Sequence, residues 1–474
     1  MSAMRLAGPR ARLCILLLVS TVLGGCSTFS QDGGFTDVRN ATKERTGKEI
    51  AWSKTDAERE TVDARTAEIL SKPLSADDAV QIALLNNRGL QASFYELGIS
   101  EADFVQAGRL PNPGFSFSRL RRGDEVEYER GVHFMLARLF AMPLLRDMES
   151  RRFASVQQQV TIEALRLASE TRKAYFTAIA AQQSLVYMRQ VKDAADASAE
   201  LGRRMAEVGN WSKLAQAREQ SFYADSTLNL ARSDQAAIRA REQLTRLMGL
   251  WGPQIQFVLP DRLPDLPKTV RELPGIEQTA MDQRLDLTQM RLQTDSLARS
   301  LGLTRATRFI NVLEVGFVRN TSNEEPTQRG YEISLEIPLF DWGGARIARA
   351  EAIYMQGVNR VAEAAINARS EVREAYNAYR IHYDITKHYR DEVVPIRKRI
   401  SEENQLRYNG MLIGVFELLA DARVQIMGVN GYIEALRDFW LADSDLQMSM
   451  MGRTSPGAAS SARQAAPVGG SGGH

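Results

Sequence analysis

Histidine and cysteine are scarce in this chain of 474 residues, which has four of the first and two of the second. His382 and His388 lie six positions apart, a spacing that suits joint binding of a metal ion on a helix poorly. The carboxylates are scattered along the chain, and no glycine-rich loop has the context of a phosphate site. These absences predict that the protein is not an enzyme and that it holds no metal or cofactor.

Both cysteines, Cys14 and Cys26, belong to the first 26 residues, so we expect no disulfide within the rest of the chain. Arg5, Arg10 and Arg12 precede the apolar run CILLLVSTVLGGC, which is too short to span a bilayer as a helix and has the length of a signal peptide. No later segment is apolar enough to be a transmembrane helix. The three leader arginines also account for the formal charge of +2, so the remaining chain is almost neutral.

The end of this run, LGGC, resembles a bacterial lipobox. The resemblance implies that residues 1–25 are a signal peptide and that Cys26 becomes the lipidation site, carrying palmitate among its acyl groups. Ser27 at the next position favours delivery to the outer membrane. An ordinary signal sequence with an incidental cysteine is the alternative.

Two halves of the chain repeat one another. ETRKAY at 170–175 recurs as EVREAY at 371–376, and AGRLPNPGFSF at 107–117 recurs loosely at 306–317. Because order and spacing are kept, the sequence indicates an internal duplication. Each copy has the same layout: a helix, two short alternating segments, a long helix, a glycine break and another helix.

The alternating segments predict β-strands near residues 115–118, 132–140, 309–318 and 331–339. In the last of them, apolar residues alternate with Glu332, Ser334 and Glu336, which gives one apolar and one charged face. The polar stretches 119–130 and 319–330 predict loops of 12 residues. An ordinary half-buried hairpin is the alternative, but strands of this length also suit a bilayer. Four strands cannot close a barrel alone, so several copies would share one.

The predicted helices are unusually long. Residues 146–208 contain no proline and only Gly202, and 63 helical residues would span about 95 Å. In the first copy, helices predicted at 212–249 and 276–307 return along this helix. In the second copy, the outbound helix is predicted at 344–409 and the returning helices at 415–451 and 75–109. Pro395 predicts a kink, either an inward taper or an ordinary helix bend. A plain dimeric coiled coil is the alternative to the arrangement as a whole.

Several stretches follow one another in a fixed order along the duplicated chain: ADDAVQIALLNN (76–87), AGRLPNP (107–113), IPLFDWGGAR (337–346) and two glycine turns. Together they resemble the TolC family of outer-membrane ducts. The resemblance implies a mainly α fold with a small β part, in which duplicated long helical hairpins carry four β-strands per protomer. A homotrimer would then form a 12-stranded β-barrel and a periplasmic α-helical tunnel. The first copy has LFAMPLLRD at 139–147 in place of the family's Phe-Asp-Gly-Gly, so its first helical turn is expected to differ.

The family resemblance also implies the function of a passive outer-membrane channel in a tripartite efflux system. Its partners would be a periplasmic adaptor (membrane fusion protein) and an inner-membrane pump, with no nucleic acid. The alternatives are a periplasmic helical adaptor, a structural lipoprotein, or the exit duct of a type I protein secretion system. The cargo, whether drug, metal, solvent or protein, stays open.

These inferences divide the chain into six parts. They are a signal peptide (1–25), a lipid-anchored N-terminal linker (26–74), a first TolC-like repeat (75–250), a proline-rich connector (251–275), a second repeat (276–452) and a disordered tail (453–474).

The glycine turns are the predicted tips of the hairpins. Gly209 and Asn210 belong to the first tip, and Gly410 and Gly414 to the second, where glycine would allow the chain to reverse. Both tips are candidate contacts for the adaptor.

Acids follow only the second tip. By resemblance, the family's two gate acids fall on Glu417 and Ala420, and a loop one residue longer displaces the second acid to Asp421. Glu417 and Asp421 are therefore the candidate periplasmic gate, where symmetry-related carboxylates would form a negative ring that favours cations. The alternative is that these acids only stabilise a helix N-terminus.

Overall fold

The computed structural model describes residues 28–308, 312–336 and 338–453. The predicted signal peptide, Cys26 and residues 454–474 of the predicted tail lie outside them. The chain divides into two units, each assembled from three separate segments. The first unit comprises Met1–Val38, Phe94–Val160 and Leu287–Ala364, and the second comprises Arg39–Ser93, Thr161–Asp286 and Ala365–His474.

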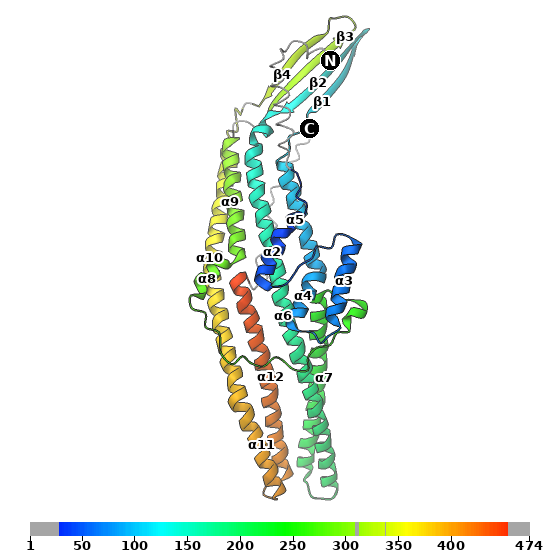
Figure 1. Ribbon diagram of the computed structural model, residues 1–474, viewed down its shortest axis with the longest axis vertical. Helices are drawn as coiled ribbons and strands as arrows, with labels where there is room; N and C mark the ends of the chain where they lie inside the picture. The colour runs from blue at the N-terminus through cyan, green and yellow to red at the C-terminus, as the bar shows by residue number, and fades with distance from the viewer. Residues whose placement is uncertain (1–27, 309–311, 337, 454–474) are drawn as a thin grey trace. The chain divides into compact units, whose positions relative to one another are not determined.

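A four-stranded antiparallel sheet belongs to the first unit (Figure 1). Its strands, in the spatial order β1-β2-β3-β4, are β1 (Gly114–Arg122), β2 (Glu125–Met135), β3 (Leu313–Ser322) and β4 (Gln328–Leu335). The hairpins from the two halves of the chain meet where β2 pairs with β3, with Val132 opposite Phe317. The sheet thus joins segments almost 200 residues apart in sequence.

The loops are shorter than the polar composition of 119–130 and 319–330 predicted, and the strands extend into both stretches. β1 and β2 are longer than predicted, whereas β3 ends at Ser322 in place of 318 and β4 begins at Gln328 and ends at Leu335 in place of 339. Residues 309–311 of the predicted third strand lie outside the described residues.

β1 and β2 pair out to Arg122 and Glu125, so only Gly123 and Asp124 form the turn. Gly123 has a φ of 65°, the left-handed conformation that such a turn requires. The expectation of two 12-residue loops was wrong because polar residues on paired strands lie on a solvent-accessible face as readily as in a loop.

The same order of elements occurs twice, as the duplication predicted. In the first copy α5 (Arg88–Ala107) precedes the hairpin, and α6 (Leu136–Glu207) and α7 (Lys213–Met248) follow it. In the second, α9 (Leu285–Ala306) precedes the hairpin, and α10 (Gly344–His388), α11 (Val394–Asn409) and α12 (Val415–Met451) follow it. No helix among the described residues combines the length and the apolarity needed to cross a membrane.

The two copies differ where strand passes into helix. In the first, α6 begins directly after Met135 and contains Pro143, so residues 136–140 of the predicted strand 132–140 are helical. In the second, Asp341 Oδ1 accepts a hydrogen bond of 2.8 Å from the backbone N–H of Gly343, whose φ is 75°. The first helical turns of the two copies therefore differ, as the departure of residues 139–147 from the family pattern predicted.

Within the first unit, charged and aromatic contacts join the helices. Arg151 lies 3.2 Å from Asp295, and Arg299 lies 3.2 Å from Asp147, which connects α6 with α9. All four side chains are more than a third exposed, so each pair contributes little to stability.

The main hydrophobic core lies in the second unit. It collects side chains from α4 (Ala76–Asn86), α6, α7, α8 (Ile276–Gln283), α10 and α12. Tyr379 and Phe439 are among its largest fully buried side chains, and their ring centroids lie 5.5 Å apart. The small residues Ala174, Ala178 and Ala180 are buried beside them on α6, so the alanine-rich sequence serves close helix packing.

The proline-rich connector forms part of this core. Apart from the short 3₁₀ helix η2 (Gly252–Ile255), residues 251–275 are not helical, yet Phe257, Leu259 and Leu263 are buried in the core cluster. Gly249, where α7 ends, has a φ of 68°, and a Cβ there would lie 2.8 Å from the carbonyl oxygen of Asn86. Only glycine satisfies both the backbone conformation and the close contact.

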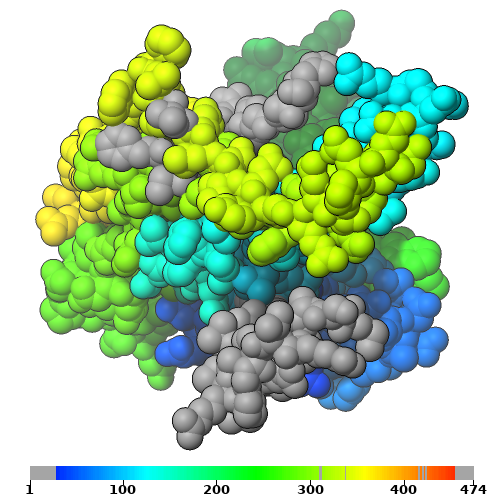
Figure 2. Space-filling view, turned by 90° about the horizontal axis from the view of Figure 1, so that it is seen from above, coloured from blue at the N-terminus to red at the C-terminus, as the bar shows by residue number. Residues whose placement is uncertain are grey.

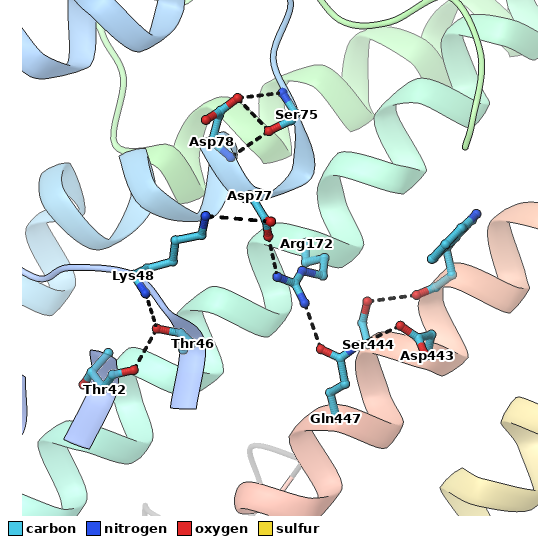
Figure 3. A network of polar contacts seen from close by, with 11 residues as sticks. Thr42, Thr46, Lys48, Ser75, Asp77, Asp78, Arg172, Asp443, Ser444 and Gln447 are labelled. Atoms are coloured by element: carbon cyan, nitrogen blue, oxygen red, sulfur yellow. Dashed lines mark hydrogen bonds and ion pairs between the residues drawn. The ribbon is translucent and has the colours of Figure 1, made fainter. Parts of the chain in front are cut away.

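A polar network connects three helices of the second unit around Arg172 (Figure 3). From α6 this guanidinium donates hydrogen bonds of 2.8 Å to Asp77 on α4 and 2.8 Å to Gln447 on α12. Lys48 adds a second cation 3.8 Å from Asp77. Arg172 is a polar residue within the apolar pattern of α6, and its guanidinium finds its hydrogen-bond acceptors within the chain.

Residues 28–74, predicted as a lipid-anchored linker, contain two helices, α2 (Phe35–Thr46) and α3 (Asp56–Leu70). α3 begins with a capping box: the Thr55 hydroxyl accepts a hydrogen bond from the Glu58 N–H, and the Glu58 carboxylate accepts one from the Thr55 N–H. Ile50 and Val62 are buried, so the part of this segment from Arg39 onward is packed within the second unit.

The long helix of the second copy is interrupted before Pro395. A five-residue π-helical turn, η3 (Tyr389–Val393), separates α10 from α11. Proline lacks the N–H that would bond to the carbonyl of Asp391, so the regular helix cannot continue through this turn. Where Pro395 predicted a kink, the structure has a π turn, a feature often found at functional positions.

Candidate functional site: two hairpin tips and a two-faced sheet

The first tip, between α6 and α7, is closed by a Schellman motif. The N–H of Asn210 bonds to the carbonyl of Met205 at 2.9 Å, and the N–H of Gly209 bonds to that of Ala206 at 3.1 Å. Gly209 has a φ of 78°, the left-handed conformation of this motif. Gly209 therefore reverses the chain, as its sequence predicted.

Trp211 folds the first tip back onto α6. A Cβ on Gly202 would lie 3.0 Å from the Trp211 ring, so the only glycine in the predicted helix 146–208 leaves room for this indole. Ser212 then caps α7, because its hydroxyl accepts a hydrogen bond of 3.2 Å from the N–H of Ala215. The sequence analysis noted Gly202 but did not connect it with the tip.

The second tip, between α11 and α12, has the same hydrogen bonds but not the same glycine. The N–H of Leu412 bonds to the carbonyl of Arg407 at 2.8 Å, and the N–H of Met411 bonds to that of Tyr408 at 2.9 Å. Met411 has a φ of 59°, whereas Gly410 has a φ of −82°. The expectation that Gly410 reverses the chain was wrong: the left-handed residue is Met411, one position later.

Met411 is the only described non-glycine residue with a positive φ. A side chain in this conformation costs about 1–2 kcal/mol, because Cβ approaches the following carbonyl oxygen. Met411 is also 93% exposed, so no packing of its side chain within the chain offsets that cost. Strain of this kind often accompanies function.

Glu417 lies in the first turn of α12. Gly414 is the N-cap and offers no side-chain acceptor, while its carbonyl accepts a hydrogen bond of 3.1 Å from the N–H of Glu417. The Glu417 side chain is exposed. This position suits an acid beside a helix N-terminus, and it also leaves the carboxylate free to face a neighbouring chain or an aqueous path.

Asp421 has a different environment, although it lies one turn farther along the same helix. Its carboxylate accepts a hydrogen bond from the side-chain amide of Asn404, a buried residue of α11. The structure therefore separates the two candidate gate acids, since Glu417 is exposed and Asp421 is engaged across the hairpin. A polar residue on the facing helix is a weak signal, and sequence reasoning did not find Asn404.

Each tip exposes apolar side chains. These are Val208 and Leu214 at the first tip, and Met411 and Leu412 at the second, all more than half exposed. The second unit also has an open groove of about 940 Å³ between α6, α7 and α12. Small residues, including Ala180, Ser184 and Gly431, line part of this groove.

The pairing register gives the sheet two chemically different faces. Phe115, Val132, Phe317 and Tyr331 form one cross-strand row, and each is exposed. Because successive residues of a strand point to opposite faces, most apolar side chains of the strands share the face of Phe115, whereas Leu120, Met135 and Val318 point to the other face. Arg130, Arg319 and Arg329 also lie on this face, the face of Phe115, so we call it the apolar–arginine face. In Figure 2, residues of β1 and β2 (cyan) and of β3 and β4 (yellow-green) lie toward the viewer.

All five glutamates of the four strands lie on the opposite, acidic face. They are Glu125, Glu127, Glu129, Glu314 and Glu332, as the register assigns them. Polar contacts within this face are consistent with the assignment, because Asn320 lies 3.4 Å from Glu129 and Ser116 lies 2.8 Å from the His133 ring. Among the described residues, no group of His, Cys, Asp or Glu side chains is arranged to hold a metal ion.

Comparisons with known proteins agree with this geometry. No protein-family model matches the sequence. The cobalt-zinc-cadmium resistance protein CzcC of Cupriavidus metallidurans is 22% identical over 284 residues, which cover 57% of this chain and 64% of that relative. The chain thus aligns with less than two thirds of the length of this relative.

Solved structures resemble the fold more completely. CusC matches with a TM-score of 0.66 and 16% identity over 80% of this chain and 92% of its own. The outer-membrane channel OprN matches with a TM-score of 0.67 and 15% identity over 88% and 96%. The Campylobacter jejuni CmeC outer-membrane channel matches with a TM-score of 0.67 and 14% identity over 88% and 92%. These matches confirm the predicted fold class of long helices with a small sheet.

Proposed function

We propose that this chain, which has the fold of the TolC-family outer-membrane channels, is the outer-membrane duct of a tripartite efflux system. The observation that carries the proposal is the sheet with one exposed apolar face and one acidic face. Strands of 8–11 residues suit a bilayer when they are tilted. An exposed apolar face opposite a polar one is the pattern of a strand with lipid on one side and water on the other.

A homotrimer is part of this proposal. β1 and β4 are the free edges of the sheet, and unpaired edges are unstable in a lipid environment. Three chains would pair these edges and supply 12 strands. In that assembly the glutamates would face the aqueous interior, and the duct would perform no chemical step of its own.

Cations, divalent metal ions among them, are the cargo class that we propose. Five glutamates per chain on the interior face would make that part of the path cation-attracting. The name of the CzcC relative, a cobalt-zinc-cadmium resistance protein, agrees with such a cargo.

The second tip is the proposed periplasmic gate, with Glu417 as its principal acid. Exposure of Glu417 and the hydrogen bond from Asn404 to Asp421 support different roles for the two acids. Glu417 would contribute to a negative ring around the closed end, whereas Asp421 would hold the hairpin together. Like charges in such a ring repel one another, which would also favour opening.

The tips are the proposed contacts for a periplasmic adaptor. Met411 and Leu412 expose apolar surface beside Gly410 and Gly414, and Val208 does so beside Gly209 and Asn210. Binding of an adaptor would also explain why the strained conformation of Met411 is kept, because the Met411 side chain would then contact the partner. An inner-membrane pump would deliver the cargo to this end.

The proposed site of action is the outer membrane of a Gram-negative bacterium, with a lipid anchor at Cys26. The lipobox-like LGGC supports the anchor. Labelling with radioactive palmitate should mark the wild-type chain and not Cys26→Ala. Equal labelling of both would contradict the anchor without affecting the duct.

Conductance in planar lipid bilayers tests the duct itself. The purified full-length protein should insert and give discrete, cation-selective channels. Glu417→Gln should reduce the cation preference, measured as the reversal potential in a salt gradient. Glu403→Gln is the matched control, because it removes one exposed acid from α11 near the same tip.

Two outcomes would contradict these proposals. A Cys26→Ala protein that is monomeric and soluble without detergent, and gives no channels, would defeat the duct and favour a structural lipoprotein. Channels whose selectivity is unaffected by Glu417→Gln would keep the duct but leave Glu417 only its place at a helix N-terminus.

A further inference from the structure

Three arginines lie side by side on the apolar–arginine face. Arg130 of β2 is paired with Arg319 of β3, and Arg319 is paired with Arg329 of β4. Neighbouring strands are about 4.8 Å apart, so the three Cα atoms span about 10 Å. We call these residues the arginine row. It lies one pleat, about 6.8 Å, beyond the apolar row that contains Phe317 and Tyr331.

No acid within the sheet neutralises the arginine row. Every glutamate of the four strands lies on the other face, and the arginine row has no ion pair with any carboxylate of the described residues. All three side chains are exposed. Like charges directly opposite one another destabilise a sheet, so this arrangement has an electrostatic cost that nothing in the fold explains.

Aromatic rings accompany the arginines. Phe117 lies in the same cross-strand row, and its ring centroid lies 6.3 Å from that of Tyr128 in the next row. The guanidinium groups of Arg119 and Arg130 lie 5.8 Å and 5.9 Å from the centre of the Tyr128 ring. Aromatic residues with polar neighbours are typical of the boundary between hydrocarbon and headgroups.

The position of the arginine row agrees with such a boundary. On the face of Tyr331, the exposed side chains of Ile333 and Leu335 continue the apolar surface toward the helices, and the exposed side chains Phe340 and Trp342 follow β4. Arg329 comes two residues beyond Tyr331 in the other direction, at the end of this apolar surface, where headgroups would begin.

We infer that the arginine row binds the phosphate groups of anionic lipid headgroups on the outer side of the sheet. This inference rests on the proposed function, because it requires the sheet to lie in a bilayer. Guanidinium groups match phosphate oxygens in geometry and charge, and a phosphate bridging two neighbouring arginines would relieve their repulsion. The occupant is a lipid and not free phosphate, because the arginines continue an apolar surface that acyl chains would cover.

Lipid retention by the full-length detergent-purified protein tests the inference. The probe is diphosphorylated lipid A, titrated in neutral detergent and followed by native mass spectrometry and by the thermal denaturation midpoint. Wild type should bind lipid A and gain stability. The triple variant Arg130→Gln, Arg319→Gln, Arg329→Gln should bind on the order of tenfold more weakly or worse, through loss of charged hydrogen bonds. Inorganic phosphate at the same phosphate concentration should give neither effect.

Two further variants serve as controls. Arg349→Gln, Arg360→Gln, Arg369→Gln removes three exposed arginines from α10 and should retain lipid A as wild type does. The corresponding triple lysine variant of the arginine row should keep part of the affinity, because the charge remains. Without lipid, the triple glutamine variant should melt no earlier than wild type, since like-charge repulsion is removed. This melting control shows that a loss of lipid binding is not a loss of folding. The single variant Arg319→Gln, which removes only the middle arginine, is measured in the same way.

Undiminished lipid A binding by the triple glutamine variant would overturn the inference. An equal loss in the α10 control, or an equal gain in stability from inorganic phosphate, would overturn it as well. The triple glutamine variant should still conduct ions in phosphatidylcholine bilayers. If the wild type forms no channels, the proposed function fails; if it forms channels but the variants bind lipid A equally, only the arginine row is assigned wrongly.

Discussion

The carboxylate of Asp421 accepts a hydrogen bond from the buried side-chain amide of Asn404, which connects α12 to α11 just beyond the second tip. The family resemblance placed Asp421 in a gate, but this contact gives the acid a role inside the hairpin. Glu417, four residues earlier on the same helix, is exposed. A single turn of helix therefore separates the proposed gating acid from an acid that joins two helices.

Removal of this contact should loosen the second tip. Asp421→Ala should lower the local free energy of unfolding by about 1–3 kcal/mol, because the buried amide of Asn404 loses a charged acceptor. Hydrogen exchange should show faster exchange of backbone amides in the last turns of α11 and the first turns of α12. Gln405→Ala, which removes only a contact within α11 to Asn409, is the control. Unchanged exchange in Asp421→Ala would mean that the contact contributes nothing to the stability of the tip.

The left-handed backbone at Met411 predicts how substitutions to and from glycine change the stability of the second tip. Met411→Gly should stabilise the second tip by roughly 1 kcal/mol, because glycine adopts this conformation without steric cost. Gly410→Ala should be nearly neutral, since its φ of −82° suits any residue and its nearest neighbour would be at 3.5 Å. Thermal denaturation in detergent measures both changes.

The first tip supplies the matched comparison. Gly209→Ala should destabilise by roughly 1 kcal/mol, because Gly209 has a φ of 78°. Equal destabilisation by Gly410→Ala would show that Gly410 reverses the chain after all. If Met411→Gly also weakened binding of an adaptor, the strain at Met411 would have a function as well as a cost.

Close packing beside the π turn predicts sensitivity at two glycines of α12. A Cβ on Gly431 would lie 3.0 Å from the Tyr389 ring, and one on Gly428 would lie 2.4 Å from Cδ of Arg397. Gly431→Ala should destabilise by about 1–3 kcal/mol, because the ring belongs to the π turn and has little freedom to shift. Gly428→Ala should cost less, because the arginine side chain is flexible.

Gly302→Ala is the control for these glycines. Gly302 lies within α9, and a Cβ there would meet nothing within 4 Å. The substitution should therefore be neutral or stabilise by up to about 1 kcal/mol through helix propensity alone. A similar loss in Gly302→Ala and Gly431→Ala would refute the packing explanation.

Arg284 predicts the largest single effect on stability. Its side chain is only 1% exposed and lies 2.7 Å from Asp286 and 2.8 Å from Glu371. Burial lowers the pKa of this guanidinium, but its hydrogen bonds to the two carboxylates outweigh burial, so the pKa lies above its ordinary value. Arg284→Met should cost about 3–5 kcal/mol, because Asp286 loses its buried cation and Glu371 retains only Arg453, at 3.6 Å.

A milder variant distinguishes charge from packing at the same place. Glu371→Gln keeps the shape and leaves Asp286 to pair with Arg284, so its effect on the unfolding midpoint should be clearly smaller. Equal effects of the two substitutions would mean that the buried arginine is not the centre of this cluster.

Sequence reasoning predicted the helices and strands well where the signal was long and regular. The stretch without proline before Gly209 corresponds to α6, and the alternation predicted from Tyr331 to Leu339 corresponds to β4 as far as Leu335. It missed α2 and α3, whose charged sequences have a weak apolar pattern and whose stability comes from a few buried side chains such as Val38 and Val62. It also misjudged both loops, because polarity alone does not distinguish a loop from a polar sheet face.

The sequence by itself determined the duplicated order of elements and the alternation within the strands, because these follow from local patterns and chain spacing. Only the tertiary structure decided which residues meet across those elements. Pairing register placed Arg130, Arg319 and Arg329 in one row and all strand glutamates on the opposite face. Packing of α11 on α12 decided that Asp421 meets Asn404, and hydrogen bonds at the tip put the strained conformation on Met411 and not on Gly410. Such pairings depend on contacts between distant segments, which no local pattern in the chain specifies.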